Sequence, residues 1–299
     1  LGAVCPTGNT VEEAWKNAAA GKSGIGRITL FDTSNVENHI AGEVRDFDPE
    51  KEMGHREARR ADRATQFAVV ASRQAMEDCS FVVTDDNRYS IGTIIGSGIG
   101  GIQSLIDAVQ AFAEKGHRGI SPLVVPRILI DSSAGKVSMD LGLRGPNMDI
   151  TTACATGNNC IGEAAEIIRR GQAKVMLAGA TEAAINPITL AGFNNMKALT
   201  GRNDEPETAS RPFDVSRDGF VPGEGAATLV LEDLDHALAR GARIYGEVLG
   251  YGHTSDAYHP TAPLETGDGA AKAMEFALLD AGLSPDDITL QILRSDGAT

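Results

Sequence analysis

Short apolar runs alternate with longer amphipathic segments along most of the chain. Five runs rich in apolar and β-branched residues predict strands, at residues 89–98, 147–153, 173–180, 226–232 and 243–252. Four segments with apolar positions three and four residues apart predict helices, at residues 59–78, 100–115, 157–171 and 268–282. Strands that alternate with helices indicate a layered α/β fold with a largely buried central sheet.

The segments outside this alternation say little about domain boundaries. The first residues are typical of the end of a strand that turns into a helix, so we expect the rest of that strand upstream of Leu1. We find no low-complexity linker and no short-period repeat. The polar stretch at residues 200–219 is too long for an ordinary turn and predicts a functional surface loop.

Composition and charge exclude several classes of protein. The 299 residues carry a formal net charge of −14, which disfavours nucleic acid or an anionic membrane as the main partner. The four cysteines form no CxxC pair and have no histidine at metal-ligand spacing, so neither a metal site nor a disulfide framework is expected. No window is apolar for long enough to span a bilayer, and no secretory signal opens the chain. We therefore expect a reduced, cytoplasmic protein.

A GxGxxG pattern at residues 96–101 follows a predicted strand and precedes a predicted helix. In dinucleotide-binding proteins this pattern belongs to the first βαβ unit, whereas about ninety residues precede it here. No strand end with a ribose-binding acid follows about twenty residues later. We therefore expect no cofactor at this position, and glycines that let a helix or a partner subunit approach closely.

Cys154 lies between an extended, Thr-rich run and a predicted helix, in the stretch ITTACATGNNCIG at residues 150–162. Cysteine is commonly buried and suits a tight corner, a role that fits the other three cysteines, Cys5, Cys79 and Cys160. Gly157 and the following helix instead place the Cys154 sulfur near a helix N-terminus, where backbone N–H groups and the dipole stabilise a thiolate or an oxyanion. Local chemistry leaves both roles open, buried filler and nucleophile.

The residues around Cys154 resemble a known family. TTACATGNN, followed by IGEAAEIIRRGQAKVMLAGATEA, is similar to the nucleophile segment of the β-ketoacyl-acyl carrier protein synthases of the KAS II type. The similarity continues through GFNNMKALT, ASRPFDVSRDGFVPGEGAATLVLE and SDAYHPTAP, and upstream through GSGIGG and LGLRGP. It extends from about residue 1 to about residue 287.

This resemblance implies an α/β, thiolase-like fold, in which two related halves form a five-layer α-β-α-β-α body, usually a homodimer. We expect residues 1–243 to form the N-terminal half and residues 244–299 to begin an incomplete C-terminal half. The resemblance also implies a ping-pong condensation in fatty acid biosynthesis. Cys154 takes an acyl chain from acyl carrier protein as a thioester, and the carbanion left by decarboxylation of malonyl carrier protein attacks it.

Further site residues follow from the resemblance. Phe193 matches the aromatic residue that lines the acyl pocket, Leu105 lies near the position that gates the acyl tunnel, and Thr261 matches a polar residue of the pantetheine channel. Without the family, Phe193 and Leu105 would be predicted as core residues. The carrier protein is acidic and needs a basic surface on a chain of this charge. The candidate docking residues are Arg56, Arg59, Arg60, Arg118 and Lys197.

The similarity ends before two histidines that family members use to support decarboxylation and condensation. The sequence ITLQILRSDGAT stands where a strand ending in a His-Gly-Thr motif is expected, and no histidine follows His259. His253 and His259 match neither family histidine. We interpret the chain as a fragment or frame-shifted copy of an elongating synthase. The alternative is a shortened, non-condensing paralogue that binds carrier protein or a synthase partner.

Two other relatives fit less well. A chain-length-factor-like subunit would lack the cysteine. A thiolase or hydroxymethylglutaryl synthase uses coenzyme A thioesters, and the ASRPFD and RDGFVPGEGA segments argue against it. The sequence leaves the acyl chain length, and the choice between a fatty acid and a polyketide pathway, undetermined.

Overall fold

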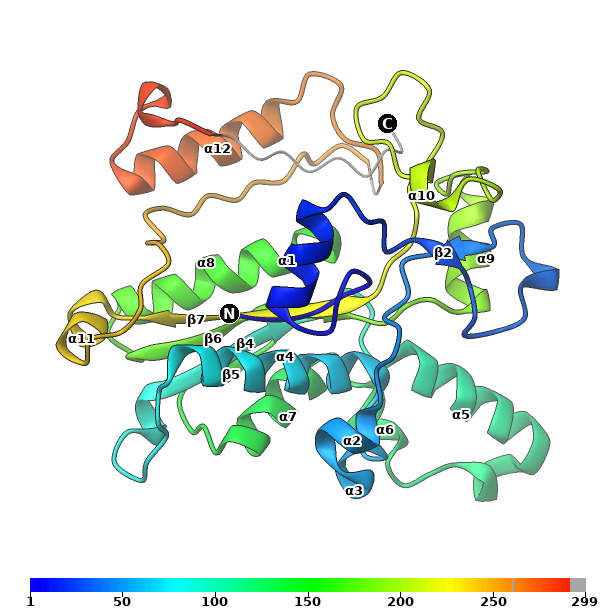
Figure 1. The fold of residues 1–299 in the computed structure, drawn as a ribbon, viewed down its shortest axis with the longest axis horizontal. Helices are drawn as coiled ribbons and strands as arrows, with labels where there is room; N and C mark the ends of the chain where they lie inside the picture. The colour runs from blue at the N-terminus through cyan, green and yellow to red at the C-terminus, as the bar shows by residue number, and fades with distance from the viewer. Residues whose placement is uncertain (260, 291–299) are drawn as a thin grey trace.

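A mixed five-stranded sheet forms the centre of the molecule, as seen in a computed structural model that describes residues 1–259 and 261–290 (Figure 1). The strand order is β1-β7-β6-β4-β5. β4 pairs in parallel with β5 and β6, whereas β7 pairs antiparallel with β6 and β1. The strands are β1 (Gly2–Val4), β4 (Ile91–Gly96), β5 (Asn147–Met148), β6 (Val175–Glu182) and β7 (Gly225–Glu232), and a separate two-stranded sheet holds β2 (Gly26–Arg27) and β3 (Ile40–Ala41).

Helices cover both faces of this sheet. α4 (Arg63–Cys79) and α7 (Ser132–Leu141) pack on one face, and α8 (Thr156–Arg169) packs on the other (Figure 1). All six residues of β4 are buried, as expected for a strand covered on both faces. Phe67 of α4 is fully buried in the larger core cluster, and burying such a side chain stabilises the fold by about 2–3 kcal/mol.

Side-chain caps begin several of the helices. The Asp62 carboxylate accepts a hydrogen bond from the Ala64 N–H at the start of α4, and from the Ser104 hydroxyl of α5 (2.6 Å). The remaining helices are α1 (Val11–Ala19), α2 (Pro49–Met53), α3 (His55–Ala58), α5 (Ile102–Lys115), α6 (Val124–Ile128), α9 (Pro187–Asn195), α10 (Pro206–Ala209), α11 (Leu234–Ala239) and α12 (Asp268–Ala281). The 3₁₀ turns are η1 (Thr33–Asn35), η2 (Arg88–Ser90), η3 (Gly116–Gly119), η4 (Ala153–Ala155) and η5 (Pro285–Asp287).

The periodicity of the sequence locates most of these elements correctly. The four predicted helices are confirmed as α4, α5, α8 and α12. The run at 89–98 contains β4, and the runs at 173–180 and 226–232 overlap most of β6 and β7. The run at 147–153 is a strand over its first two residues only. Residues 200–219 form an irregular segment interrupted by the short helix α10, in agreement with the predicted loop.

The predicted strand at residues 243–252 is wrong. A strand needs a partner for its backbone groups, and in the part of the chain that the structure describes no strand pairs with this run. Side chains of α8 and α12 form hydrogen bonds with part of its backbone instead. The Arg169 guanidinium donates to the carbonyl oxygens of Val248 and Leu249, and the Tyr251 N–H donates to Asp280.

α12 lies farther from the sheet, on the α8 side (Figure 1). The Arg169 guanidinium of α8 contacts the Asp280 carboxylate of α12 at 2.8 Å and joins the two helices. Within residues 1–259 and 261–290, we find no helix that combines the length and apolarity needed to cross a membrane.

Candidate active site

Cys154 is the middle residue of the η4 turn, which directly precedes α8. Ala153, the residue before it, has a φ of +50°, a left-handed conformation that costs energy for a residue with a β-carbon. The turn is closed by two hydrogen bonds, from the Ala155 N–H to the Thr152 carbonyl (3.1 Å) and from the Thr152 N–H to the Thr156 hydroxyl (2.9 Å). Cys154 is exposed. A strained turn therefore presents this thiol at the N-terminal end of a 14-residue helix.

The glycines of the GxGxxG pattern allow close packing beneath this turn. A β-carbon on Gly96 would lie 2.4 Å from the Thr156 side chain, and one on Gly98 would lie 2.7 Å from the Glu182 carboxylate. A β-carbon on Gly101 would lie 1.9 Å from the carbonyl oxygen of Arg127. The predicted close approach is confirmed, and the neighbours are residues of the same chain.

Two partly buried acids near the turn, Glu182 and Asp149, were missed by sequence reasoning. Glu182, at the end of β6, accepts hydrogen bonds from the Ser97 hydroxyl (3.2 Å) and the Gly98 N–H (2.9 Å), and burial raises the pKa of its carboxyl group. Burial also raises the pKa of Asp149 to about 6. The Asp149 Oδ2 atom is buried without a hydrogen-bond partner among the described residues. The signal available in the sequence was an acid inside or directly after an apolar run.

The other cysteines differ from Cys154 in their surroundings. Cys160 is fully buried in α8, and burial raises the pKa of its thiol to about 11. Burial also raises the pKa of Cys79. At neutral pH both groups are neutral thiols and weak nucleophiles, which agrees with the structural role predicted for them.

Phe193, Leu105 and Thr261 lie on three different segments. Phe193 in α9 packs against Phe220, with ring centroids 5.2 Å apart at 80°, in a cluster that includes Leu190. Leu105 in α5 is 42% exposed. Thr261 is exposed, and its N–H donates to the His259 ring at 3.2 Å. Among the described residues, no shared cluster or hydrogen bond joins Phe193, Leu105 and Thr261 to one another.

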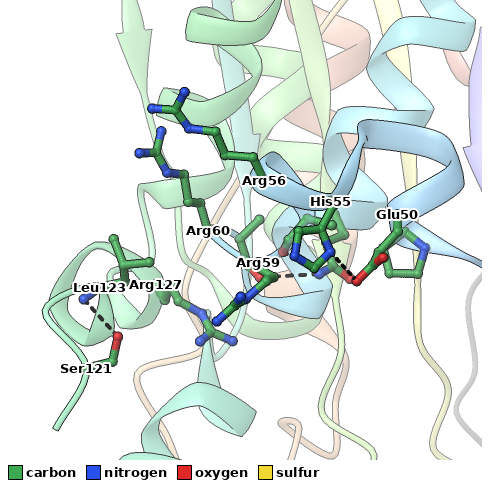
Figure 2. Close-up of a pocket in the computed structure, with 12 residues that line it drawn as sticks. Glu50, His55, Arg56, Arg59, Arg60, Ser121, Leu123 and Arg127 are labelled. Atoms are coloured by element: carbon green, nitrogen blue, oxygen red, sulfur yellow. Dashed lines mark hydrogen bonds and ion pairs between the residues drawn. The ribbon is translucent and has the colours of Figure 1, made fainter.

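Three of the five predicted docking residues line one open pocket of about 680 Å³ (Figure 2). Arg56, Arg59 and Arg60 reach it from α3 and the residues directly after it, and Arg127 of α6 reaches it from the opposite side. Arg127 was not predicted, because it belongs to an apolar segment far from the others in sequence. The remaining two candidates, Arg118 and Lys197, are exposed outside the pocket lining.

We call the pocket lined by Arg56, Arg59, Arg60 and Arg127 the arginine pocket, and its positive charge is only partly compensated. Glu57 pairs with Lys136 and lies 3.6 Å from Arg60, and the contact with Lys136 lowers the pKa of Glu57. Arg56 and Arg59 have no ion-pair partner in the described part of the chain. The Nε atom of Arg127 is buried without a hydrogen-bond partner there. These guanidinium groups are therefore available to an anionic ligand or an acidic protein surface.

A mixed sheet between helical layers, with a cysteine on the turn before α8, defines the class of thiolase-like condensing enzymes. A solved β-ketoacyl synthase from Burkholderia phymatum STM815 superposes with a TM-score of 0.85 at 34% identity, over 96% of this chain and 70% of that one. The family described as "Beta-ketoacyl synthase, N-terminal domain" matches residues 1–237. The chain belongs to the β-ketoacyl synthase family, as the sequence motifs predicted.

Two further relatives refine this assignment. The 3-oxoacyl-[acyl-carrier-protein] synthase 2 of Staphylococcus aureus (strain N315) is 48% identical over all 299 residues, which span 72% of its length. A type II PKS acyl carrier protein in complex with its ketosynthase (AntDE:AntF) gives a TM-score of 0.85 at 31% identity, over 95% of this chain and 69% of that one. The predicted KAS II type, the thiolase-like fold and the acyltransferase class are confirmed. The expected position of the His-Gly-Thr motif falls on residues 291–299, outside the described residues.

Proposed function

We propose that the chain is a 3-oxoacyl-[acyl-carrier-protein] synthase II-like enzyme in which Cys154 is the nucleophile. The observation that carries this proposal is the exposed Cys154 thiol on a strained turn at the start of α8. The 48% identity to a named synthase over the whole chain favours this activity over a non-condensing paralogue.

In the first half-reaction, the Cys154 sulfur attacks the thioester carbonyl of acyl-loaded carrier protein. A new C–S bond forms, the bond to the pantetheine sulfur breaks, and the carrier leaves as a thiol with the proton from Cys154. The carbonyl oxygen becomes an oxyanion during this step, and backbone N–H groups at the start of α8 stabilise it. The N–H of Cys154 itself, on the η4 turn before α8, is a further donor in the proposed geometry.

In the second half-reaction, malonyl carrier protein loses CO₂, and the resulting carbanion attacks the Cys154 thioester. The product is a 3-ketoacyl chain two carbons longer, and the Cys154 thiolate is released. Decarboxylation generates the carbanion without a strong base, and the thioester is an activated electrophile. In this proposal Phe193 and Leu105 line the acyl pocket and Thr261 lies in the pantetheine channel.

The arginine pocket is proposed as the docking surface for acyl carrier protein. The net charge of −14 makes a local basic surface necessary for an acidic partner. Arg56, Arg59 and Arg60 supply it, Arg127 adds to it, and Arg118 and Lys197 lie outside it and would contact the carrier at its edges. The solved AntDE:AntF complex, in which a ketosynthase holds its carrier protein, supports this choice of partner.

We also propose that the protein forms a homodimer and that its N-terminal half ends at residue 243. β5 is an edge strand with both residues exposed, so it offers unpaired backbone groups to a second copy in a homodimer. We place the boundary of the N-terminal half at residue 243, shortly after α11, because the sheet and its covering helices precede it and the family match ends at residue 237. No disulfide joins the four cysteines, which supports a reducing, cytoplasmic location.

The test is transfer of an acyl group to Cys154. Purified protein is incubated with acyl-loaded carrier protein, and intact mass spectrometry measures the mass added to the chain. We expect one acyl adduct that is absent in Cys154→Ala and present in the matched control Cys160→Ala, because Cys160 is buried. A folded wild-type chain that never acquires the adduct contradicts the proposal.

A further inference from the structure

A chain of two side-chain hydrogen bonds joins the Cys154 turn to a distant segment. The Thr152 hydroxyl donates to the Asn159 side-chain oxygen at 2.5 Å. The Asn159 side-chain N–H donates to the Tyr251 hydroxyl, also at 2.5 Å and across 92 positions of sequence. Thr152 precedes Cys154 by two residues, and Asn159 lies in the first turns of α8.

Tyr251 is held firmly against α8. A β-carbon on Gly162 would lie 2.3 Å from the Tyr251 ring, so the ring packs directly on the backbone of α8. The Tyr251 N–H donates to Asp280 (2.9 Å), which also accepts from Arg169. The His253 ring stacks on the outer side of this arrangement, 5.2 Å from the Tyr251 ring at 7°. The position of the Tyr251 hydroxyl is therefore fixed by contacts from α8 and α12.

The turn itself needs such support. Thr151 to Ala155 are exposed, and Ala153 adopts the left-handed conformation, from which an unrestrained residue relaxes. Asn159 is buried, and its amide bonds both neighbours at once, because its oxygen accepts from Thr152 and its nitrogen donates to Tyr251. Tyr251 accepts the hydrogen bond from the Asn159 nitrogen and so holds the Asn159 side chain in place. The Asn159 amide in turn orients Thr152.

We propose that Tyr251, Asn159 and Thr152 form a positioning relay that holds the Cys154 turn in the geometry needed for acyl transfer. None of the three is a catalytic residue, because each acts through the turn. The inference rests on the proposed role of Cys154. It means that Tyr251, in the segment after α11, affects the reactivity of a cysteine that belongs to the N-terminal half. Displacement of a reacting group by about 1 Å can slow a reaction by about 100-fold, so loss of one hydrogen bond in the relay is expected to be measurable.

The first variant is Tyr251→Phe, which removes the hydroxyl and keeps the ring on Gly162. Its matched control is Tyr245→Phe, on the same segment, whose hydroxyl donates instead to Asp78 at 2.9 Å. We expect the rate of Cys154 acylation to fall about five- to tenfold in Tyr251→Phe, as for loss of about 1 kcal/mol of hydrogen bonding, with unchanged carrier affinity. Tyr245→Phe should acylate at the wild-type rate. A Tyr251→Phe rate equal to that of Tyr245→Phe overturns the proposal.

The second pair tests the other end of the relay. Thr152→Ser keeps a hydroxyl for Asn159, whereas Thr152→Val keeps the shape and removes it. We expect acylation to remain within about twofold of wild type in Thr152→Ser and to fall about five- to tenfold in Thr152→Val, while the melting temperatures of the two variants stay close. Equal losses of rate in both variants, in step with lost stability, indicate a purely structural role and overturn the proposal.

A separate readout distinguishes failure of this inference from failure of the proposed function. The rate of Cys154 alkylation by iodoacetamide, followed by peptide mass spectrometry, reports the presentation of the thiol without any carrier protein. If wild-type protein alkylates at Cys154 but never acylates, the proposed function fails and the relay is judged on alkylation alone. Tyr251→Phe and Thr152→Val must then differ from their control variants in alkylation rate, and no difference overturns the relay.

Discussion

A β-carbon on Gly96 would lie 2.1 Å from the carbonyl oxygen of Ile150. The last residue of β4 therefore touches the backbone of the segment that leads from β5 to the Cys154 turn. The same hypothetical β-carbon would lie 2.9 Å from the buried Cys160 sulfur. Gly96 thus sets how closely the sheet, the turn and α8 approach one another.

Substitution of Gly96 tests this contact. In Gly96→Ala the backbone of Ile150 must move, because a carbonyl oxygen has no alternative rotamer, and we expect a loss of about 1–3 kcal/mol in the free energy of unfolding. The matched control is Gly135→Ala in α7, where a β-carbon meets nothing within 4 Å, and where alanine should stabilise the helix by about 0.5–1 kcal/mol. Urea denaturation of both variants measures the difference. Equal effects in the two variants would contradict the close contact.

The two cysteines near the start of α8 are expected to differ in reactivity. Burial raises the pKa of Cys160 to about 11, so only about one part in a thousand of that group is thiolate at pH 8, and the side chain is also inaccessible. Cys154 is exposed. Iodoacetamide at pH 8, followed by peptide mapping, should label Cys154 at least about 100-fold faster than Cys160 in native protein. Comparable labelling that persists in native buffer would show that α8 does not enclose Cys160.

Much of the fold could be predicted because the relevant information is local. The apolar run of β6 and the amphipathic spacing of α4 and α8 are visible within single windows of sequence. The failure at residues 243–252 has the opposite cause, because a run with strand-like residues becomes a strand only when another strand accepts its backbone hydrogen bonds. In this structure the Arg169 guanidinium bonds part of that backbone instead.

For the candidate site, too, residues recognisable from local sequence were predicted, and residues brought together only by folding were missed. Cys154 could be identified from the residues directly around it, and the Arg56 cluster from a single run of six residues. Arg127 reaches the same pocket from another helix, and Tyr251 meets Asn159 across 92 positions of sequence. Only the folded chain brings these residues together.

Asp149 predicts a pH dependence of stability. Its pKa is raised by burial from 3.8 to about 6, so the folded state binds more protons than the unfolded state between about pH 4 and pH 6. The contribution of Asp149 to stability therefore falls as the pH rises through that window and stays unfavourable above it. Asp149→Asn keeps an acceptor for the Thr151 hydroxyl and removes the charge. We expect it to stabilise the protein at pH 8 by on the order of 1–2 kcal/mol, allowing for partial solvent screening.

Urea denaturation at pH 5 and pH 8 checks this expectation. The gain in Asp149→Asn should be larger at pH 8 than at pH 5. Asp131 also raises the pKa of Asp149 through its charge, so Asp131→Asn should give a smaller gain of the same sign. An Asp149→Asn variant that is less stable than wild type at pH 8 would show that the charged carboxylate has a partner in solution.

The arginine pocket predicts which charges matter most for carrier binding. Arg59→Glu and Arg127→Glu each place a carboxylate among the remaining guanidinium groups, and we expect carrier affinity to fall about tenfold or more in each, with a weaker dependence on salt. Arg118→Glu, outside the pocket, should have a smaller effect. Arg144→Glu changes an exposed arginine beside Tyr89 by the same charge and serves as the control. Fluorescence anisotropy with labelled carrier protein at two salt concentrations measures all four. Losses as large in Arg144→Glu as in Arg59→Glu would mean that net charge, and not this pocket, governs binding.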